Sequence, residues 1–325
     1  MKVSIVLLTY NSSYYLKDLL SSLTSQDFDE DYEVLIIDSG SSDNTLDIIK
    51  DFDSIRLIEI PNSEFQHGRT RNFAAQEAQG DFIVYITTSS LPASKQWLKE
   101  ITQPFDLNPK IVAVYGKHLP RINCNPFVAA DVVHAFNWIS PNNELLVEYL
   151  KDQETFESLP VEERDRRRFY SDANSALRKS YWLEHPYPEV DYAEDQAMGV
   201  QVLKTGFKKV YSPTAAVYHS HSYPLKQYFK RKVDEIIALK KRGEIEYKGI
   251  LHYIAATFFK WKNGLVFLKS SKNYSISQKS LWVFKSLAFA LSDQLAIVLV
   301  TTQNPNNSKL VKLFSLEREM KKGAK

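Results

Sequence analysis

The sequence predicts an α/β fold in which helices cover both faces of a sheet, followed by a helical region at the C-terminal end. Two observations lead to this prediction. Through the first half of the 325 residues, short β-rich runs alternate with segments of helical periodicity. Beyond Tyr223 the composition changes to long amphipathic helices rich in lysine and aromatic residues. We therefore expect a boundary near Pro224, which divides an α/β domain (1–224) from a helical region (225–325).

The apolar runs of the first half indicate buried strands. A continuous apolar run bounded by turn-forming residues is typical of a strand that is covered on both faces. The second run, for example, ends at Asp38, where the polar segment from Asp38 to Asp43 begins. The predicted strands are residues 3–8, 34–37, 55–60, 82–86 and 111–115.

Helices are predicted between these strands. Apolar residues recur at helical spacing over residues 15–23, which indicates an amphipathic helix. Asp43 is a suitable N-cap for a short helix over residues 44–50. Gly80 follows a helix predicted over residues 70–78 and would end it.

The pattern is less regular later in the chain. A further helix precedes the strand at 111–115, and scattered prolines follow in the segment 116–168. Its charged run, residues 162–168, is interpreted as a mobile loop or a short solvated helix. After the boundary, apolar residues over 225–239 share one helical face, and Gly243 would end that helix.

The composition limits the class of protein. With 44% hydrophobic residues, 25% charged residues and a net charge of +2, it is typical of a globular protein and gives no support for nucleic-acid binding. The single cysteine, Cys124, excludes an internal disulfide and suits a reducing cytosol. No secretory signal precedes the first strand, so we expect the protein to stay inside the cell. The apolar stretch 281–300 contains Lys285 and Asp293 and falls short of the roughly 20 clean residues that a membrane span needs.

Polar residues follow the predicted strands, where ligands of an open parallel sheet bind. A nucleotide-sugar needs an acceptor for the imide N–H of its base, donors for its diphosphate and a base that activates the incoming hydroxyl. Asp38 can accept from the imide, and Arg69 or Arg71 can donate to the diphosphate. Some of these polar residues also have a simpler structural role, since Asn11 and Asp43 are suited to capping helices.

Taken together in order, these segments resemble the family-2 glycosyltransferases of the GT-A fold. The first strand with Thr9, Tyr10 and Asn11, followed by the segment from Asp38 to Asp43, resembles the start of that family. The run FQHGRTRN at 65–72 is similar to the FxHGxTRN signature of its rhamnosyltransferase branch. Further similar segments are GKHLP at 116–120, CNPF at 124–127, SDANSA at 171–176, YAEDQ at 192–196 and HSHSY at 219–223.

The resemblance implies where the sugar donor binds. Thr9, Tyr10 and Asp38 would contact the nucleoside, with Asp38 accepting from a thymine or uracil imide, and Arg71 and Asn72 would lie near the diphosphate. The other expected donor-binding residues are Asn11, Ser41, Asp43, His67, Arg69 and Ser89.

The resemblance also implies that Asp195 is the catalytic base. A single in-line displacement at the anomeric carbon inverts its configuration and needs one carboxylate to take the acceptor proton. Asp195 stands beside Glu194 at the expected start of a helix. The simpler interpretation of this pair is two first-turn carboxylates that the helix dipole favours. Glu194, Asn174 and Ser175 are assigned to the acceptor or sugar pocket.

Ser89 departs from the family pattern and puts a metal cofactor in doubt. The family usually has an acidic residue at this place after the fourth strand, and a carboxylate is what Mg²⁺ or Mn²⁺ bridging a diphosphate requires. One explanation is that Arg69, Arg71 and basic residues of the segment 226–232 stabilise the leaving group without a metal.

Two more explanations remain open for the departure at Ser89. His219 and His221 lie on one face of an extended segment and could chelate a metal near Asp195, although packing or diphosphate binding is the commoner use of such residues. The last explanation is a chain that keeps the fold of a transferase and has lost turnover.

The C-terminal third interleaves aromatic and aliphatic residues with lysines, as in FFKWK at 258–262, and Lys321 and Lys322 lie near its end. Such helices can lie on an anionic membrane surface. The alternative is an ordinary helical bundle that packs on the sheet or across a homodimer, with solvated lysines.

The sequence therefore predicts an inverting hexosyltransferase that moves L-rhamnose from a thymidine-diphosphate donor to a lipid-linked cell-envelope polysaccharide, in the cytoplasm at the inner face of the membrane. A rival of the same class is a transferase of another UDP- or dTDP-hexose. A rival of another class is an inactive transferase-like subunit that binds a glycan or an active partner, which Ser89 favours.

Overall fold

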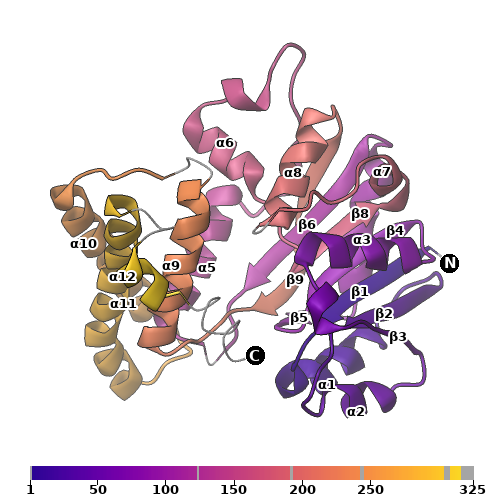
Figure 1. The fold of residues 1–325 in the computed structure, drawn as a ribbon, viewed down its shortest axis with the longest axis horizontal. Helices are drawn as coiled ribbons and strands as arrows, with labels where there is room; N and C mark the ends of the chain where they lie inside the picture. Colours follow the sequence, from indigo (N-terminus) through magenta and orange to yellow (C-terminus); the bar gives the residue numbers. More distant parts are fainter. Residues whose placement is uncertain (1, 123, 191–192, 242–244, 304–307, 316–325) are drawn as a thin grey trace. The chain divides into compact units, whose positions relative to one another are not determined.

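The computed structural model describes residues 2–122, 124–190, 193–241, 245–303 and 308–315 (Figure 1). These residues form two compact units. Unit 1 comprises Met1–Pro120 and Val133–Ser220, and unit 2 comprises Arg121–Val132 and His221–Lys325. Tyr192, Gly243, Lys321 and Lys322, which the sequence-based predictions include, lie outside the described residues.

Unit 1 is built on a mixed sheet in the strand order β3-β2-β1-β4-β8-β6-β9-β5, with β7 paired to β9. Strands β3, β2, β1 and β4 run parallel, and β8 is antiparallel to β4 and β6. Strand β9 is parallel to β6 and antiparallel to β5 and β7. The strands are β1 (Val3–Thr9), β2 (Tyr32–Asp38), β3 (Ile55–Glu59), β4 (Phe82–Thr87), β5 (Ser90–Pro92), β6 (Ile111–Leu119), β7 (Leu146–Glu148), β8 (Asn174–Arg178) and β9 (Lys208–His219).

Helices cover both faces of this sheet. Alternate residues of a strand point to opposite faces, and Val3, Ile5 and Leu7 of β1 belong to the apolar core that includes α1 (Ser13–Leu23) and α4 (Trp97–Thr102). On the other face, the Ser4 hydroxyl accepts a hydrogen bond from the N–H of Gly80 (2.8 Å), which follows α3 (His67–Glu77). Figure 1 shows α1 and α2 (Thr45–Lys50) on one side of β1 and β2, and α3 on the other. The predicted α/β architecture is confirmed.

The parallel pairing aligns the carboxyl ends of four strands. Thr9 of β1 pairs with Asp38 of β2, Asp38 pairs with Glu59 of β3, and Leu8 of β1 pairs with Thr87 of β4. The loops that follow these strands therefore leave the sheet at the same edge, where ligands of such sheets bind.

The ends of the third helix differ from the prediction. Helix α3 begins at His67 rather than at Thr70, because the side chain of Gln66 caps it by accepting a hydrogen bond from the N–H of Arg69 (2.6 Å). Gly80 has another role than ending the helix. A Cβ atom on Gly80 would lie 2.6 Å from the backbone nitrogen of Ser4, so the glycine lets the chain pass close to β1.

The segment 116–168 contains more regular structure than its irregular pattern predicts. Helix α5 (Pro126–Ile139) begins with a proline, which is compatible with the first turn of a helix. The charged run forms α6 (Val161–Arg168), and Arg166 pairs with the buried Glu148 of β7 (Nη1 to Oε1 3.1 Å), so the helix is anchored rather than simply solvated. The remaining elements of unit 1 are η1 (Asn62–Glu64), η2 (Gln103–Leu107), η3 (Phe156–Ser158), α7 (Lys179–Glu184) and α8 (Glu194–Lys204).

Unit 2 is helical, as predicted for the C-terminal region. Apolar residues of α9 and α11 form one core, which includes Val233 and Ala296, and Phe127 of α5 packs with Phe289 of α11 in another. An ion pair joins Lys260 of α10 to the buried Asp293 of α11, and the Tyr228 hydroxyl donates to the same carboxylate (2.6 Å). The helices are α9 (Leu225–Lys241), α10 (Ile250–Ser270), α11 (Ile276–Thr302) and α12 (Lys309–Leu313).

Helix α11 is longer than the apolar stretch identified in the sequence. By length and composition it is the one helix in the described part of the chain that could cross a membrane, with a mean hydropathy of 1.7. This differs from the prediction that residues 281–300 fall short. A helix in the core of a bundle meets the same criteria, and α11 buries Phe289, Asp293 and Ala296 within unit 2.

Candidate active site

The carboxylate of Asp38 organises the loop after β2. Its Oδ1 accepts hydrogen bonds from the N–H groups of Gly40 (3.0 Å) and Ser41 (2.8 Å), and its Oδ2 accepts from the hydroxyls of Thr9 (2.7 Å) and Ser41 (2.6 Å). Gly40 has a φ of 81°, which favours glycine. Asp38 is 0% exposed, and the four bonds use the acceptor sites of both oxygens. A base imide could bond to Asp38 only by displacing one of these donors.

Asn11 joins the loop after β1 to the loop after β2. Its Oδ1 accepts from the N–H groups of Ser42 (2.8 Å) and Asp43 (3.3 Å), and its own N–H donates to the Ser41 hydroxyl (2.8 Å). Asn11 has a positive φ of 46°, a conformation that asparagine tolerates better than most residues. The neighbouring Tyr10 is 48% exposed. Asn11 and Ser41 therefore hold the loops together, and Tyr10 presents an accessible ring beside them.

Asp43 connects the starts of two helices. It accepts from the N–H of Ser13 (3.2 Å) at the start of α1 and from the N–H of Thr45 (3.0 Å) at the start of α2. Slight burial opposes ionisation, but these bonds outweigh it and lower the pKa of Asp43 to about 2. Asn44, not Asp43, occupies the N-cap position of α2, which corrects the predicted cap by one residue.

Arg71 of α3 is buried between two carboxylates. Its Nε lies 2.7 Å from Oδ2 of Asp172, and its Nη1 pairs with Oε1 of Glu194 at the start of α8. The Asp172 carboxylate also accepts from the hydroxyls of Ser175 (2.7 Å) and Tyr187 (2.9 Å). Burial opposes its charge, but the two carboxylates outweigh burial and raise the pKa of Arg71. Arg71 is thus held by protein groups, and Asp172 is a central residue that the sequence analysis did not assign to the site.

Asp195 stands at the start of α8, half-buried, beside this cluster. Its Oδ2 accepts from the N–H of Asp172 (3.4 Å), and its Oδ1 accepts from the N–H of Gln196 (2.8 Å). Burial, then the negative charges of Asp172 and Glu194, raise the pKa of Asp195 from 3.8 to about 7, against the opposing charge of Arg71. One cation faces three carboxylates here, so Asp195 is suited to take up a proton near neutral pH.

Arg69 and His67 lie on the exposed side of the N-terminal turn of α3. No described residue pairs with the guanidinium of Arg69. Nδ1 of His67 lies 3.9 Å from Oε1 of Glu194, and its ring packs against Phe65. Of the two arginines assigned to the diphosphate, Arg69 is the accessible one.

Three residues assigned to ligand binding are hydrogen-bonded to other parts of the protein. Asn72 accepts from the N–H of Tyr187 (2.8 Å) and donates to its carbonyl (2.9 Å), which fixes the segment before α8 onto α3. Asn174 is buried and accepts from the indole of Trp97 (2.8 Å). Ser175 is buried as well and donates to Asp172. None of these side chains is exposed.

The hydroxyl of Ser89 belongs to a polar cluster after β4. Ser89 and Ser90 lie 3.3 Å and 3.1 Å from Nδ1 of His219 at the end of β9, and the Ser90 hydroxyl donates to the carbonyl of Ala173 (2.8 Å). Ala173 follows Asp172, and the N–H of Asp172 donates to the carboxylate of Asp195. The polar cluster and Asp195 therefore lie at the same edge of the sheet, beside the end of β4.

His219 and His221 fall in different units of the chain. The ring of His221 stacks on Tyr223 (5.3 Å between centroids), and burial together with the charges of Arg231 and Arg121 lowers the pKa of His221 to about 4. Among the described residues, no group of three or more His, Cys, Asp and Glu side chains is arranged to hold a metal ion.

This arrangement agrees with the comparisons with known proteins. The family model of glycosyl transferase family 2 matches residues 4–172, and the chain belongs to this family. The chain is 30% identical over 237 residues to the O-antigen chain rhamnosyltransferase RfbN of Salmonella typhimurium, which covers 72% of this chain and 71% of that protein. It is 33% identical over 205 residues to the O-antigen chain rhamnosyltransferase WbaN of Salmonella anatum, covering 62% and 61%.

Solved structures share the fold. The mannosyltransferase PcManGT from Pyrobaculum calidifontis, solved with GDP-Man and Mn²⁺, has a TM-score of 0.57 at 14% identity, over 94% of this chain and 88% of that chain. The Staphylococcus aureus protein TarS, residues 1–349, has a TM-score of 0.51 at 18% identity, over 98% and 77%. The expected GT-A fold is confirmed, and the chain is a glycosyltransferase.

Proposed function

We propose that this chain transfers L-rhamnose from dTDP-L-rhamnose, with inversion at the anomeric carbon, to a lipid-linked glycan of the cell envelope. The observation that carries the proposal is the half-buried Asp195, whose pKa is raised to about 7. A general base works best when its pKa lies near the working pH. The structure of the cluster around Arg71 thus supports the role that the family resemblance implies for Asp195.

The proposed reaction is a single displacement. Ionised Asp195 accepts the proton of an acceptor hydroxyl while the hydroxyl oxygen forms a bond to the anomeric carbon of the sugar. The bond from that carbon to the donor phosphate breaks, and the nucleoside diphosphate leaves with the electron pair. Arg69 and the N-terminal N–H groups of α3 receive the diphosphate charge in this proposal, because helix N-termini and guanidinium groups bind phosphate oxygens well.

The sugar is inferred from the relatives. RfbN and WbaN are O-antigen chain rhamnosyltransferases, and the match with RfbN covers more than two-thirds of both chains. We therefore propose rhamnose as the transferred sugar and an envelope polysaccharide as the acceptor class. A donor with another hexose is the alternative of the same class.

The residues after β4 do not fit a hard cation. Ser89, Ser90 and Thr87 offer hydroxyls and His219 an imidazole, whereas Mg²⁺ and Mn²⁺ at a diphosphate prefer carboxylates. We therefore propose no ligands in this chain for a metal comparable to the Mn²⁺ in PcManGT, and the proposed displacement does not use one.

An anionic membrane surface is the proposed location, on the cytoplasmic side. Helix α10 exposes Ile254, Phe258 and Phe259 together with Lys262 and Lys269, a combination that suits interfacial binding to anionic lipids. Purified chain should sediment with phosphatidylglycerol vesicles and not with phosphatidylcholine vesicles. Dimerisation through this face, seen as a doubled mass in solution without vesicle binding, would contradict the proposal.

A donor screen tests the proposed activity. Purified chain would be incubated with dTDP-L-rhamnose, dTDP-D-glucose, UDP-D-glucose or UDP-GlcNAc, with and without EDTA, and release of the nucleoside diphosphate measured. We expect the highest turnover with dTDP-L-rhamnose and a rate that resists EDTA. Faster turnover of another donor would replace rhamnose as the proposed sugar. Loss of turnover with EDTA would establish a metal requirement. No turnover by wild-type protein with any donor would favour a binding subunit.

A further inference from the structure

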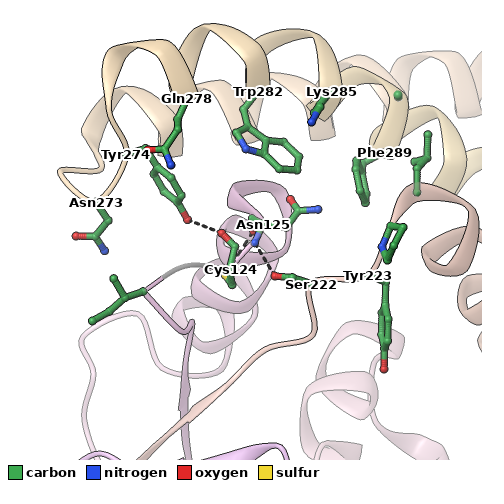
Figure 2. Close-up of a pocket in the computed structure, with 14 residues that line it drawn as sticks. Cys124, Asn125, Ser222, Tyr223, Asn273, Tyr274, Gln278, Trp282, Lys285 and Phe289 are labelled. Atoms are coloured by element: carbon green, nitrogen blue, oxygen red, sulfur yellow. Dashed lines mark hydrogen bonds between the residues drawn. The ribbon is translucent and has the colours of Figure 1, made fainter. Parts of the chain in front are cut away.

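Unit 2 contains a pocket that lies wholly within its own residues. Its volume is about 630 Å³, within the range of roughly 300–1,000 Å³ that is typical of small-molecule sites. Figure 2 shows Trp282, Lys285 and Phe289 extending from α11 toward Asn125 and Tyr223 on the opposite wall. The other lining residues are Ile122, Cys124, Ser222, Pro224, Leu225, Asn273, Tyr274, Gln278 and Ala288.

The walls of the pocket are held in place by hydrogen bonds. The Tyr274 hydroxyl donates to the carbonyl of Cys124 (3.1 Å), and the N–H of Asn125 donates to the Ser222 hydroxyl (2.7 Å). Oδ1 of Asn125 accepts from the N–H of Phe127 (2.9 Å), which fixes this amide at the start of α5. The pocket is thus pre-formed rather than a gap between loose segments.

Several polar groups of the pocket are available to a ligand. No described residue accepts a hydrogen bond from the indole N–H of Trp282, the side-chain N–H₂ of Gln278 or that of Asn125. The ammonium of Lys285 lies 5.4 Å from the centroid of the Trp282 ring. The side chain of Asn273 is exposed at the rim. The pocket therefore combines aromatic surface with neutral amides, which both donate and accept.

This lining selects among classes of ligand. It contains no carboxylate, so it does not suit a metal ion or an amine, and its single cation, Lys285, is too few for a nucleotide diphosphate. A lipid chain would leave the side-chain N–H₂ of the buried Asn125 without a partner, which is costly. A neutral polyhydroxyl ligand satisfies the amides through its hydroxyls and packs its C–H face on the ring of Trp282.

We propose that this pocket binds a short oligosaccharide segment of the growing glycan, behind the end whose hydroxyl Asp195 activates. The inference rests on the proposed function, since it assigns the recognition of the acceptor to unit 2. Trp282 supplies the stacking surface, and Asn125 and Gln278 supply the orienting hydrogen bonds. The pocket would then determine which acceptor glycans the chain extends.

Saturation-transfer NMR on the full chain tests the proposal, with methyl α-L-rhamnoside and methyl β-D-glucoside as probes. We expect millimolar binding of at least one glycoside, weakened about ten-fold or more by Trp282→Ala and by Ala288→Phe, which fills the pocket. Phe284→Ala is the matched control, because Phe284 is an exposed aromatic residue of the same helix outside the pocket lining, and it should bind within two-fold of wild type.

The outcomes separate this proposal from the proposed function. Donor hydrolysis without acceptor should be unchanged in Ala288→Phe. If wild-type protein turns over the donor but binds neither glycoside, the pocket proposal alone is overturned. If wild-type protein binds a glycoside but turns over no donor, the proposed function alone is overturned. Binding that is unaffected by both pocket variants would also overturn the pocket. So would capture of decaprenyl phosphate in detergent micelles by wild-type protein that binds neither glycoside. Should Trp282→Ala not fold, Ala288→Phe and Trp282→Phe carry the test.

Discussion

Asp172 donates its backbone N–H to the carboxylate of Asp195 (3.4 Å) while its own carboxylate is paired with Arg71 (2.7 Å). The carboxylates of Asp172 and Glu194, which would repel one another, are both paired with the guanidinium of Arg71. The arrangement keeps Asp172 and Glu194 paired and leaves Asp195 with the raised pKa. It separates the groups that build the cluster from Asp195, the group that we propose exchanges a proton.

The activity should depend on pH through Asp195. Because the base must be ionised, kcat/KM should fall about ten-fold for each unit of pH below the pKa of about 7 and level off above it. The measurement is kcat/KM for dTDP-L-rhamnose from pH 5 to 9, with circular dichroism to show that the chain stays folded. A flat profile across pH 7 would exclude Asp195 as the titrating base.

Replacement of Asp195 by asparagine should abolish transfer and stabilise the protein at alkaline pH. Since the pKa rises from 3.8 unfolded to about 7 folded, the folded chain holds an extra proton between these values. That stabilisation is complete below pH 3.8 and is lost as the pH rises through 7. At 1.36 kcal/mol per pKa unit, the loss is at most about 4 kcal/mol.

The amide that Asp195→Asn introduces stays neutral at every pH, so the variant avoids this loss. We therefore expect the melting temperature of Asp195→Asn to exceed that of wild type at pH 8.5 and to approach it at pH 4.5, with donor affinity nearly unchanged. Equal or lower stability of the variant at pH 8.5 would show that the folded protein does not raise the pKa of Asp195.

Arg71 should tune Asp195 rather than bind the donor. Arg71→Gln removes the positive charge that pairs with both Asp172 and Glu194. We expect a loss of roughly 3 kcal/mol in stability, as for other disrupted buried ion pairs, and a shift of the kcat/KM profile to higher pH, because Arg71 lowers the pKa of Asp195. A profile that does not move, measured on folded variant, would contradict this role.

Arg69 is the matched comparison on the same helix. Its guanidinium is exposed and pairs with no described residue, so Arg69→Gln should leave the melting temperature and the pH profile unchanged. A lost charge-assisted hydrogen bond to phosphate is worth at least about 1.5 kcal/mol, so the KM for the donor should rise about ten-fold. An unchanged KM would remove Arg69 from the diphosphate site.

The sequence predicts which loops meet at the carboxyl edge of the sheet better than it predicts the cluster of Arg71, Asp172 and Glu194. Strands β1, β2 and β4 are continuous apolar runs, and their parallel order places Thr9, Asp38 and Thr87 together, so the loops after them could be identified in advance. The pairing of Arg71 with Asp172 joins residues far apart in the chain, one on α3 and one just before β8, and no local pattern predicts it. The hydrogen bonds of Asn72 and Asn174 could not be predicted for the same reason, because their partners lie on other elements.

Asp38 offers a test between direct contact with the nucleotide base and organisation of the loop. The structure favours organisation, because Asp38 is fully buried and already accepts four hydrogen bonds. Asp38→Asn can keep its oxygen toward the N–H groups of Gly40 and Ser41 and donate its N–H₂ to the hydroxyls, which can reorient. Asp38→Ala leaves the buried N–H groups unpaired at about 1–3 kcal/mol.

We therefore expect Asp38→Asn to bind dTDP within about three-fold of wild type and Asp38→Ala to lose affinity and thermal stability together. Isothermal titration with dTDP and thermal unfolding measure the two effects. If Asp38 accepts the base imide directly, the amide presents a donor to a donor, and Asp38→Asn should lose dTDP as completely as Asp38→Ala while keeping its stability. Thr9→Val, which removes one hydroxyl donor to the same carboxylate, should lower stability only slightly and serves as the control for changes in the loop.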